Sequence, residues 1–190
     1  MTWPTFAFFL YFLLAFEVGL RDSLAIGTMG IAPSFMLVYM VFIASNARAW
    51  TAVWAALTLG LLVDLTSIYV VGGDVRVVVG PYAIGYVAGA LITIETRSVL
   101  YRRHPLTIAV QTLLAGIAVH LVVAIMLSMR QVLSRLLPAA DIGFSTGDDL
   151  VLRFFTLLYS VGLAIPLGFL LNRLTPLFNF DFRPRIGPVR

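Results

Sequence analysis

The sequence predicts an all-α polytopic membrane protein, a bundle of about six transmembrane helices. Of its 190 residues 61% are hydrophobic and only 12% are charged, whereas a soluble domain has roughly 45–50% apolar and about 25% charged residues. A helix that crosses a bilayer needs about 20 mostly apolar residues. Blocks of this kind, separated by short polar breaks, occupy residues 3–20, 30–45, 49–70, 77–94, 106–129 and 150–174.

The first two blocks need separate justification. No Lys or Arg precedes the apolar run of 3–20 and no small-residue cleavage pattern follows it, so we interpret it as an uncleaved helix rather than a signal peptide. The block 30–45 is short for a span, and its Pro33 stands where the first turn of a helix accepts proline. If this second block did not cross, the number of spans would be odd and the termini would lie on opposite sides.

The distribution of arginine predicts the orientation. Six spans place both termini, the turn 46–50 and the loop 95–105 on one side of the bilayer. That side carries about twice as many arginines as the opposite loops, so the positive-inside rule puts both termini in the cytoplasm. The two sets are Arg48, Arg97, Arg102, Arg103, Arg173, Arg183, Arg185 and Arg190 against Arg21, Arg76, Arg130 and Arg135.

The chain predicts one membrane domain, residues 1–176, followed by a cytoplasmic Arg/Pro-containing tail, residues 177–190. The longest break, 130–149, is too short to bury a core of its own. Residues 130–138 fit either a short helix at the outer interface or a continuation of the fifth helix. The tail fits either adhesion to anionic membrane lipids or docking to a cytoplasmic partner.

Several function classes are excluded or disfavoured by composition. Cysteine does not occur in the sequence, so there is no disulfide framework and no thiolate metal site. We find no metal-ligand spacing, no Gly-rich phosphate loop and no nucleophile with a base. We therefore predict no catalytic residue, metal or cofactor, and a protein that is not an enzyme. The net charge of +4 comes from arginines that mostly flank apolar blocks, which indicates membrane topology rather than nucleic-acid binding.

Asp64 is the most informative residue. It lies about two-thirds of the way along the block 49–70, and a carboxylate near the bilayer centre costs about 2.5–3.5 kcal/mol on insertion scales. It therefore predicts a polar anchor inside the bundle or at a partner interface. Alternatively the helix ends early, as Thr66, Ser67 and the following Gly72-Gly73 pair permit, and Asp64 lies among the headgroups.

Three further polar residues lie within the predicted spans. Glu17 and Arg21 are four residues apart, the spacing of an ion pair along one helix face. Arg153 lies at a similar predicted depth and either neutralises Asp64 or Glu17, or extends to the outer headgroups. His120 is near the middle of the fifth block, where a neutral hydrogen-bonding histidine is more common than a proton relay or ligand.

Small residues are spaced for close helix packing. Gly85 and Gly89 form a GxxxG pattern, Ala52 and Ala56 form a small-xxx-small pair, and Gly60 precedes Asp64 by one turn. Such patterns let helix backbones approach one another within a bundle or a dimer. We expect packing inside the bundle.

One region resembles a known family. The stretch GLLVDLTS from Gly60 to Ser67, the glycine pair at 72–73 and the stretch GPYAIGYVAG from Gly80 to Gly89 are similar to the bacterial rod shape-determining protein MreD. Members of that family carry a Gly-Leu-Leu-x-Asp stretch, a glycine-containing turn and a helix with a Gly-Tyr pair. The length and hydropathy profile over residues 6–174 also agree, while the outer loop and the Arg/Pro tail depart from the pattern.

The resemblance implies a non-catalytic scaffold subunit of the cell-elongation (rod) complex in the bacterial inner membrane. Its expected partners are the bitopic protein MreC and, through it, the MreB filament and the peptidoglycan synthases. It also implies a fold like the substrate-binding subunits of energy-coupling-factor vitamin transporters. The alternative function is small-molecule transport, with Asp64, Arg153 and His120 lining a pocket open to the outer face.

Overall fold

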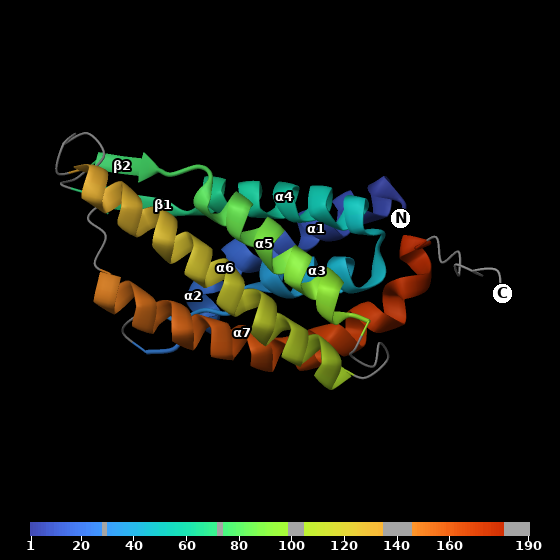
Figure 1. Cartoon of the computed structure of the whole chain (residues 1–190). Coiled ribbons are helices and arrows are strands. Elements are labelled where there is room, and N and C mark those ends of the chain that lie inside the picture. Colours follow the sequence, from blue (N-terminus) through green and yellow to red (C-terminus); the bar gives the residue numbers. More distant parts are fainter. Residues whose placement is uncertain (28–29, 72–73, 99–104, 135–145, 181–190) are drawn as a thin grey trace.

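The computed structural model describes residues 1–27, 30–71, 74–98, 105–134 and 146–180, which fold mainly into helices (Figure 1). The elements are α1 (Trp3–Gly19), α2 (Arg21–Leu24), α3 (Phe35–Asn46), α4 (Ala49–Thr66), β1 (Ile68–Val71), β2 (Asp74–Val77), α5 (Pro81–Thr96), α6 (Pro105–Ser134), α7 (Thr146–Leu174) and the 3-10 helix η2 (Thr175–Phe178).

Each predicted block contains a helix, but the helices differ in length. Three apolar stretches in the described residues are long enough to cross a membrane, Ala49–Thr66, Leu106–Leu133 and Leu150–Phe178. Trp3–Gly19 and Phe35–Asn46 are shorter apolar helices. The structure therefore agrees with a helical membrane protein, while the number of six crossings stays a prediction.

A short β-hairpin lies between α4 and α5 in a structure that is otherwise mostly helical, in agreement with the predicted all-α class. Strands β1 and β2 pair antiparallel, with Ile68 opposite Val77 and Val71 opposite Asp74. As a result α4 ends at Thr66 rather than at 70, and α5 begins at Pro81 rather than at 77. The sequence here is a β-branched run on both sides of Gly72-Gly73, and β-branched residues fit strands better than helices.

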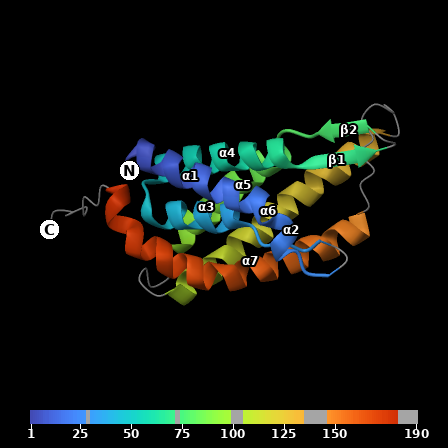
Figure 2. The ribbon, with the colours of Figure 1, turned by 180° about the vertical axis from the view of Figure 1, so that it is seen from behind.

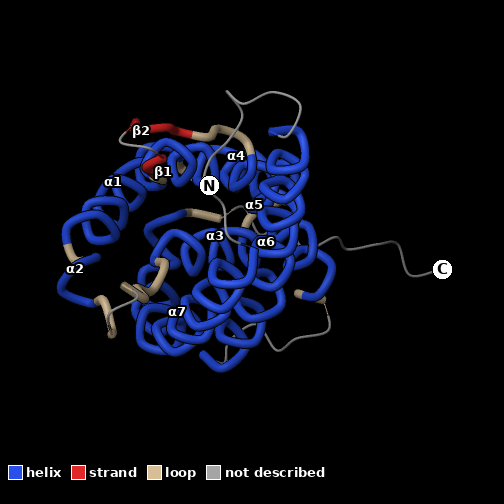
Figure 3. Tube along the Cα trace, turned by 90° about the vertical axis from the view of Figure 1, so that its left-hand side faces the viewer, coloured by secondary structure: helices blue, strands red, loops and turns tan. Residues whose placement is uncertain are grey.

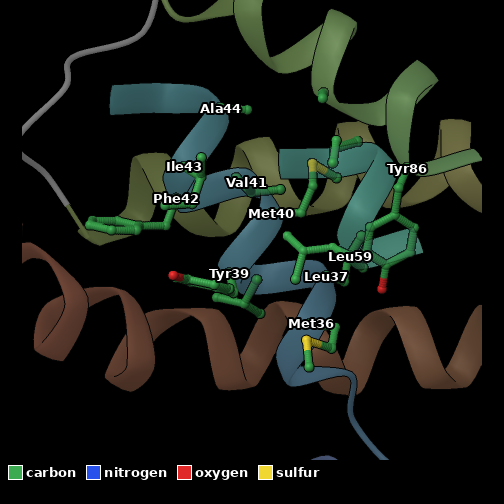
Figure 4. Packing of buried hydrophobic residues seen from close by; sticks show 14 of the residues in the cluster. Met36, Leu37, Tyr39, Met40, Val41, Phe42, Ile43, Ala44, Leu59 and Tyr86 are labelled. Atoms are coloured by element: carbon green, nitrogen blue, oxygen red, sulfur yellow. The ribbon is translucent and has the colours of Figure 1, made fainter. Parts of the chain in front are cut away.

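Helix α3 occupies the centre of the bundle. Every residue from Phe35 to Ala44 is buried, and α3 contacts α1, α4, α5, α6 and α7. Figure 3, seen along the bundle, shows α3 inside the other helices, and Figure 4 shows its side chains with Leu59 of α4 and Tyr86 of α5. A helix that is apolar on all sides is expected to be buried in this way.

The length of α3 leaves room in the bundle. Its 12 residues rise about 18 Å, whereas the hydrocarbon core of a bilayer is about 30 Å thick. Helices α6 and α7, with 30 and 29 residues, rise about 45 Å each. The long helices therefore extend well past the N-terminal end of α3.

The small residues singled out above all lie inside the bundle. Ala52, Ala56, Gly60, Gly85 and Gly89 are buried. A Cβ at Gly60 would lie 2.5 Å from the carbonyl oxygen of Tyr82, so α4 and α5 touch through their backbones there. A Cβ at Gly89 would lie 3.1 Å from the carbonyl oxygen of Ala115 on α6.

The start and the end of the described chain meet at one end of the bundle. The backbone N–H of Thr2 donates to the carbonyl oxygen of Phe178 at 3.1 Å, and Figure 2 shows α1 running from this end across the face of the bundle. Phe178 and Phe180 are buried, so packing continues past the predicted domain boundary at 176. Residues 181–190 of the predicted tail lie outside the described part.

The segment after the fifth block is helical for a further turn. Helix α6 continues past Met129 to Ser134, so the structure has the continuation rather than a separate interfacial helix over these residues. Residues 135–145 lie outside the described part.

Candidate functional site

A cavity of about 610 Å³ lies beside the N-terminal end of α3. The lining residues belong to α1, to the segment before α3, and to α4, α5, α6 and α7. They include both hydrophobic and polar side chains. The polar side chains that matter here are Glu17, Ser34, Tyr82, Tyr86, His120 and Arg153. The volume is within the range of about 300–1,000 Å³ that small-molecule sites occupy.

The floor of the cavity is the capped start of α3. The Glu17 carboxylate accepts a hydrogen bond from the backbone N–H of Met36 at 2.7 Å and another from the Ser34 hydroxyl at 2.9 Å. The Ser34 Oγ in turn accepts from the backbone N–H of Leu37 at 3.2 Å. The positive end of a helix is stabilised by a carboxylate and by an N-cap serine, and α3 has both.

A guanidinium group also lines the cavity. Nη1 of Arg153 donates to the Tyr82 hydroxyl at 2.7 Å, and the guanidinium carbon lies 5.6 Å from the centre of the Tyr82 ring. Tyr82 belongs to α5 and Arg153 to α7, so this contact joins two helices. It places the guanidinium group of Arg153 at the cavity.

His120 lines the same cavity from α6. Both of its ring nitrogens are buried, and neither has a hydrogen-bond partner among the described residues. A buried polar atom without a partner is costly and uncommon in native structures. Because both ring nitrogens are buried, the side chain lines the cavity without exposing either nitrogen to it.

Asp64 does not line the cavity but anchors α5 to α4. Its carboxylate is fully buried and accepts 2.9 Å hydrogen bonds from the backbone N–H groups of Gly80, Tyr82 and Ala83. These are groups that a helix start leaves without partners. Helix α4 does end early, as one interpretation of the sequence had it, yet the carboxylate is enclosed by protein.

Gly80 makes this anchor possible. It is the N-cap residue of α5 and has a φ of 127°. Residues with a Cβ atom rarely adopt this conformation, whereas glycine does so readily. Tyr82 then connects the anchor to the cavity, because its backbone N–H binds Asp64 while its hydroxyl binds Arg153.

The structure thus brings together some of the predicted polar residues. Glu17, His120 and Arg153 line one cavity, and Asp64 is buried beside it. The hydrogen bonds of Glu17 go to the start of α3, and Arg21 interacts with the Glu17 carboxylate electrostatically. Arg153 donates a hydrogen bond to the Tyr82 hydroxyl.

Sequence reasoning missed Ser34, Tyr82 and Tyr86. Ser34 carried a signal, because a serine directly before an apolar block is a typical N-cap. The two tyrosines are part of the GPYAIGY stretch but were assigned no role. Within the described residues there is no group of three or more His, Asp or Glu side chains that could hold a metal ion.

Comparisons with protein-family models, with curated proteins and with solved structures gave no match.

Proposed function

We propose that the chain is a non-catalytic scaffold subunit of the bacterial cell-elongation complex, similar to MreD, in the inner membrane with both termini cytoplasmic. In this role it binds an MreC-like bitopic partner and, through it, acts with the MreB filament and the peptidoglycan synthases to maintain cell shape. The proposal rests on the resemblance at residues 60–89, which the geometry of that region supports.

The observation that carries the proposal is the junction between α4 and α5. Gly60 and Asp64 are four residues apart, so they lie on one face of α4. Gly60 lets the backbone of α5 approach, since any Cβ would meet Tyr82 and Ala83. Asp64 caps the same helix start. In the Gly-Leu-Leu-x-Asp pattern the glycine therefore permits the close contact between the two helices, and the aspartate caps the start of the second helix. Few other residue pairs could do both.

The packing also limits where a partner binds. Gly60, Gly85 and Gly89 are used within the bundle, so they are not a free groove for a foreign helix. A partner helix would therefore contact the apolar outer surface, as van der Waals packing between membrane helices allows.

Copurification tests the proposal. The tagged full chain is expressed with the MreC-like protein of the same cell and purified in mild detergent, and a stoichiometric complex is expected. Asp64→Ala should weaken the complex and disturb cell shape, with protein level and thermal unfolding measured beside it. Asp22→Asn, an exposed position on α2, is the control. A folded wild-type chain that never captures the MreC-like protein would refute the proposal.

The cavity favours a second candidate, the substrate-binding subunit of a small-molecule transporter. A binding screen with vitamin-type solutes distinguishes the two. Saturable binding of one solute together with failure to capture an MreC-like protein would favour transport.

A further inference from the structure

We propose that the transmembrane helix of the bitopic partner docks on the outer face of α7 and places a small hydroxyl side chain, serine or threonine, in a gap at Gly162. The carbonyl oxygen of Gly162 accepts the hydrogen bond of that hydroxyl. This inference rests on the proposed scaffold function and names the surface at which the partner binds.

Helix α7 has one face that no other helix covers. It packs against α6 and α3 and runs along one side of the bundle (Figures 1 and 2). Exposed residues recur on its outer face at alternating spacings of three and four, at Phe155, Leu158, Gly162, Ile165 and Phe169. This is the spacing with which one helix packs lengthwise against another.

Gly162 leaves a gap in the middle of this row. A Cβ atom at Gly162 would have no other atom of the described structure within 4 Å. Its neighbours in the row are large, with Leu158 45% and Phe169 59% exposed. Gly162 is also about 3 Å along the helix axis from the centre of the apolar stretch Leu150–Phe178. The gap therefore lies at the depth of the hydrocarbon core.

Pro166 leaves a polar group without its usual partner in this gap. Proline has no backbone N–H, so the carbonyl oxygen of Gly162 lacks the donor that an α-helix supplies four residues later. Pro166 lies inside α7, and it is exposed like Gly162. The side chains of Ile165 and Pro166, one turn further along, have no donor either. The hydrocarbon core has no water to replace the donor, so a neighbouring helix is expected to supply it.

A partner helix with a hydroxyl side chain complements both the shape and the charge of this site. Serine and threonine are small enough for the gap, and their O–H donates to a carbonyl oxygen, which has a partial negative charge. Such residues are enriched where membrane helices pack together. A second copy of α7 fits worse, because no exposed side chain between residues 154 and 170 carries a donor. We therefore assign the face to a different chain.

Two substitutions test the gap and the carbonyl separately. The MreC-like partner is titrated against the tagged full chain in mild detergent. Gly162→Leu fills the gap and should weaken binding on the order of tenfold, the cost of overpacking a contact. Pro166→Ala restores the N–H, so the carbonyl bonds within α7. We expect about three- to tenfold weaker binding, the range for one hydrogen bond between membrane helices, from a chain that is itself more stable.

The matched control is Gly19→Leu. Gly19 ends α1, is exposed, and likewise has nothing within 4 Å of its Cβ position. It should bind the partner like the wild type. Thermal unfolding of every variant without the partner is expected to show no loss of stability, so weaker binding by Gly162→Leu cannot be attributed to misfolding.

Crosslinking locates the partner helix directly. The sequence contains no cysteine, so Gly162→Cys introduces the only thiol of the chain. Single cysteines are placed along the transmembrane helix of the partner, and the membranes are oxidised with copper phenanthroline. We expect disulfides at partner positions on one helix face. Ile117→Cys, at an exposed position on α6, should give none.

The possible results distinguish this inference from the scaffold function. Partner binding by Gly162→Leu and Pro166→Ala equal to that of Gly19→Leu would overturn the docking face and leave the scaffold function standing. A disulfide between two copies of Gly162→Cys, without one to the partner, would also overturn it and indicate a dimer of the chain. A folded wild-type chain that never binds the MreC-like protein would refute both proposals. If Gly162→Leu does not fold, Pro166→Ala and the crosslinks decide.

Discussion

Glu17 and Arg97 lie at opposite ends of the same buried helix, and each has the charge that its end of the helix attracts. The Glu17 carboxylate accepts from the backbone N–H of Met36 at the start of α3. Nη1 of Arg97 donates to the carbonyl oxygens of Ala44 at 3.1 Å and Ala47 at 2.6 Å at its end. A short helix surrounded by protein cannot use water for these groups, so side chains from α1 and from the end of α5 take its place.

Removing either charge should therefore destabilise the bundle. Glu17→Gln replaces one of the two accepting oxygens with an amide NH₂ that would face a donor, and Arg97→Gln withdraws the donor from two carbonyls. We expect each change to lower the free energy of unfolding by about 1.5–3 kcal/mol. The measurement is unfolding by sodium dodecyl sulfate in mixed micelles.

The matched control for the α3 caps is Glu95→Gln, which removes a charge at an exposed position near the end of α5. Its cost should stay within about 0.5 kcal/mol. A Glu17→Gln variant as stable as Glu95→Gln would contradict the assignment of Glu17 as a cap.

Asp64→Asn tests the anchor between α4 and α5. The three backbone N–H groups share two carboxylate oxygens, whereas asparagine offers one oxygen and places its NH₂ against a donor. We expect a loss of about 2 kcal/mol or more, and a larger loss for Asp64→Ala. Chemical unfolding of the purified protein measures it, with exposed Asp22→Asn as reference. Equal stability of the two asparagine variants would show that the carboxylate is dispensable.

The general position of the helices could be predicted because hydropathy marks every block. The ends of α4 and α5 could not, since short apolar runs rich in β-branched residues suit a buried helix or a strand. The hairpin over Ile68–Val77 took residues from both predicted blocks. Whether such a run becomes a helix or a strand depends on its pairing with another segment. The composition of the run alone does not predict that pairing.

The site was predictable in composition but not in its contacts. Depth in a six-span topology grouped Glu17, Asp64 and Arg153, and two of these line the cavity. The local spacing rule paired Glu17 with Arg21 but did not indicate its hydrogen bonds to Ser34 and Met36. Asp64 binds backbone 16 to 19 residues away. Every residue except proline carries the same backbone N–H donor, so no sequence pattern shows which of these donors a carboxylate will bind.

Gly60→Ala should weaken the contact between α4 and α5. The new Cβ would lie 2.5 Å from the Tyr82 carbonyl oxygen and 2.7 Å from the Cα of Ala83, and both are backbone atoms that move only if the helices separate. We expect a destabilisation of about 1–3 kcal/mol, seen as a lower midpoint of thermal unfolding in detergent. Gly162→Ala is the control, because nothing lies within 4 Å of its Cβ position and alanine favours the helix by roughly 1 kcal/mol. A Gly60→Ala variant as stable as Gly162→Ala would refute the close approach.

Phe178→Ala should loosen the end of the bundle where the described chain begins and ends. The Phe178 ring is fully buried, lies 5.0 Å from the ring of Phe9 and 5.4 Å from that of Phe42, and stacks on Phe180 at 5.5 Å. Lipid is as apolar as the core, so the loss comes mainly from the cavity and the missing ring contacts. We therefore expect about 2–3 kcal/mol, the lower part of the range for buried aromatic truncations. Leu177→Ala, at the exposed neighbouring position, should change stability little. Limited proteolysis near the C-terminus measures the loosening, and equal cleavage of the two variants would show that Phe178 does not hold this end closed.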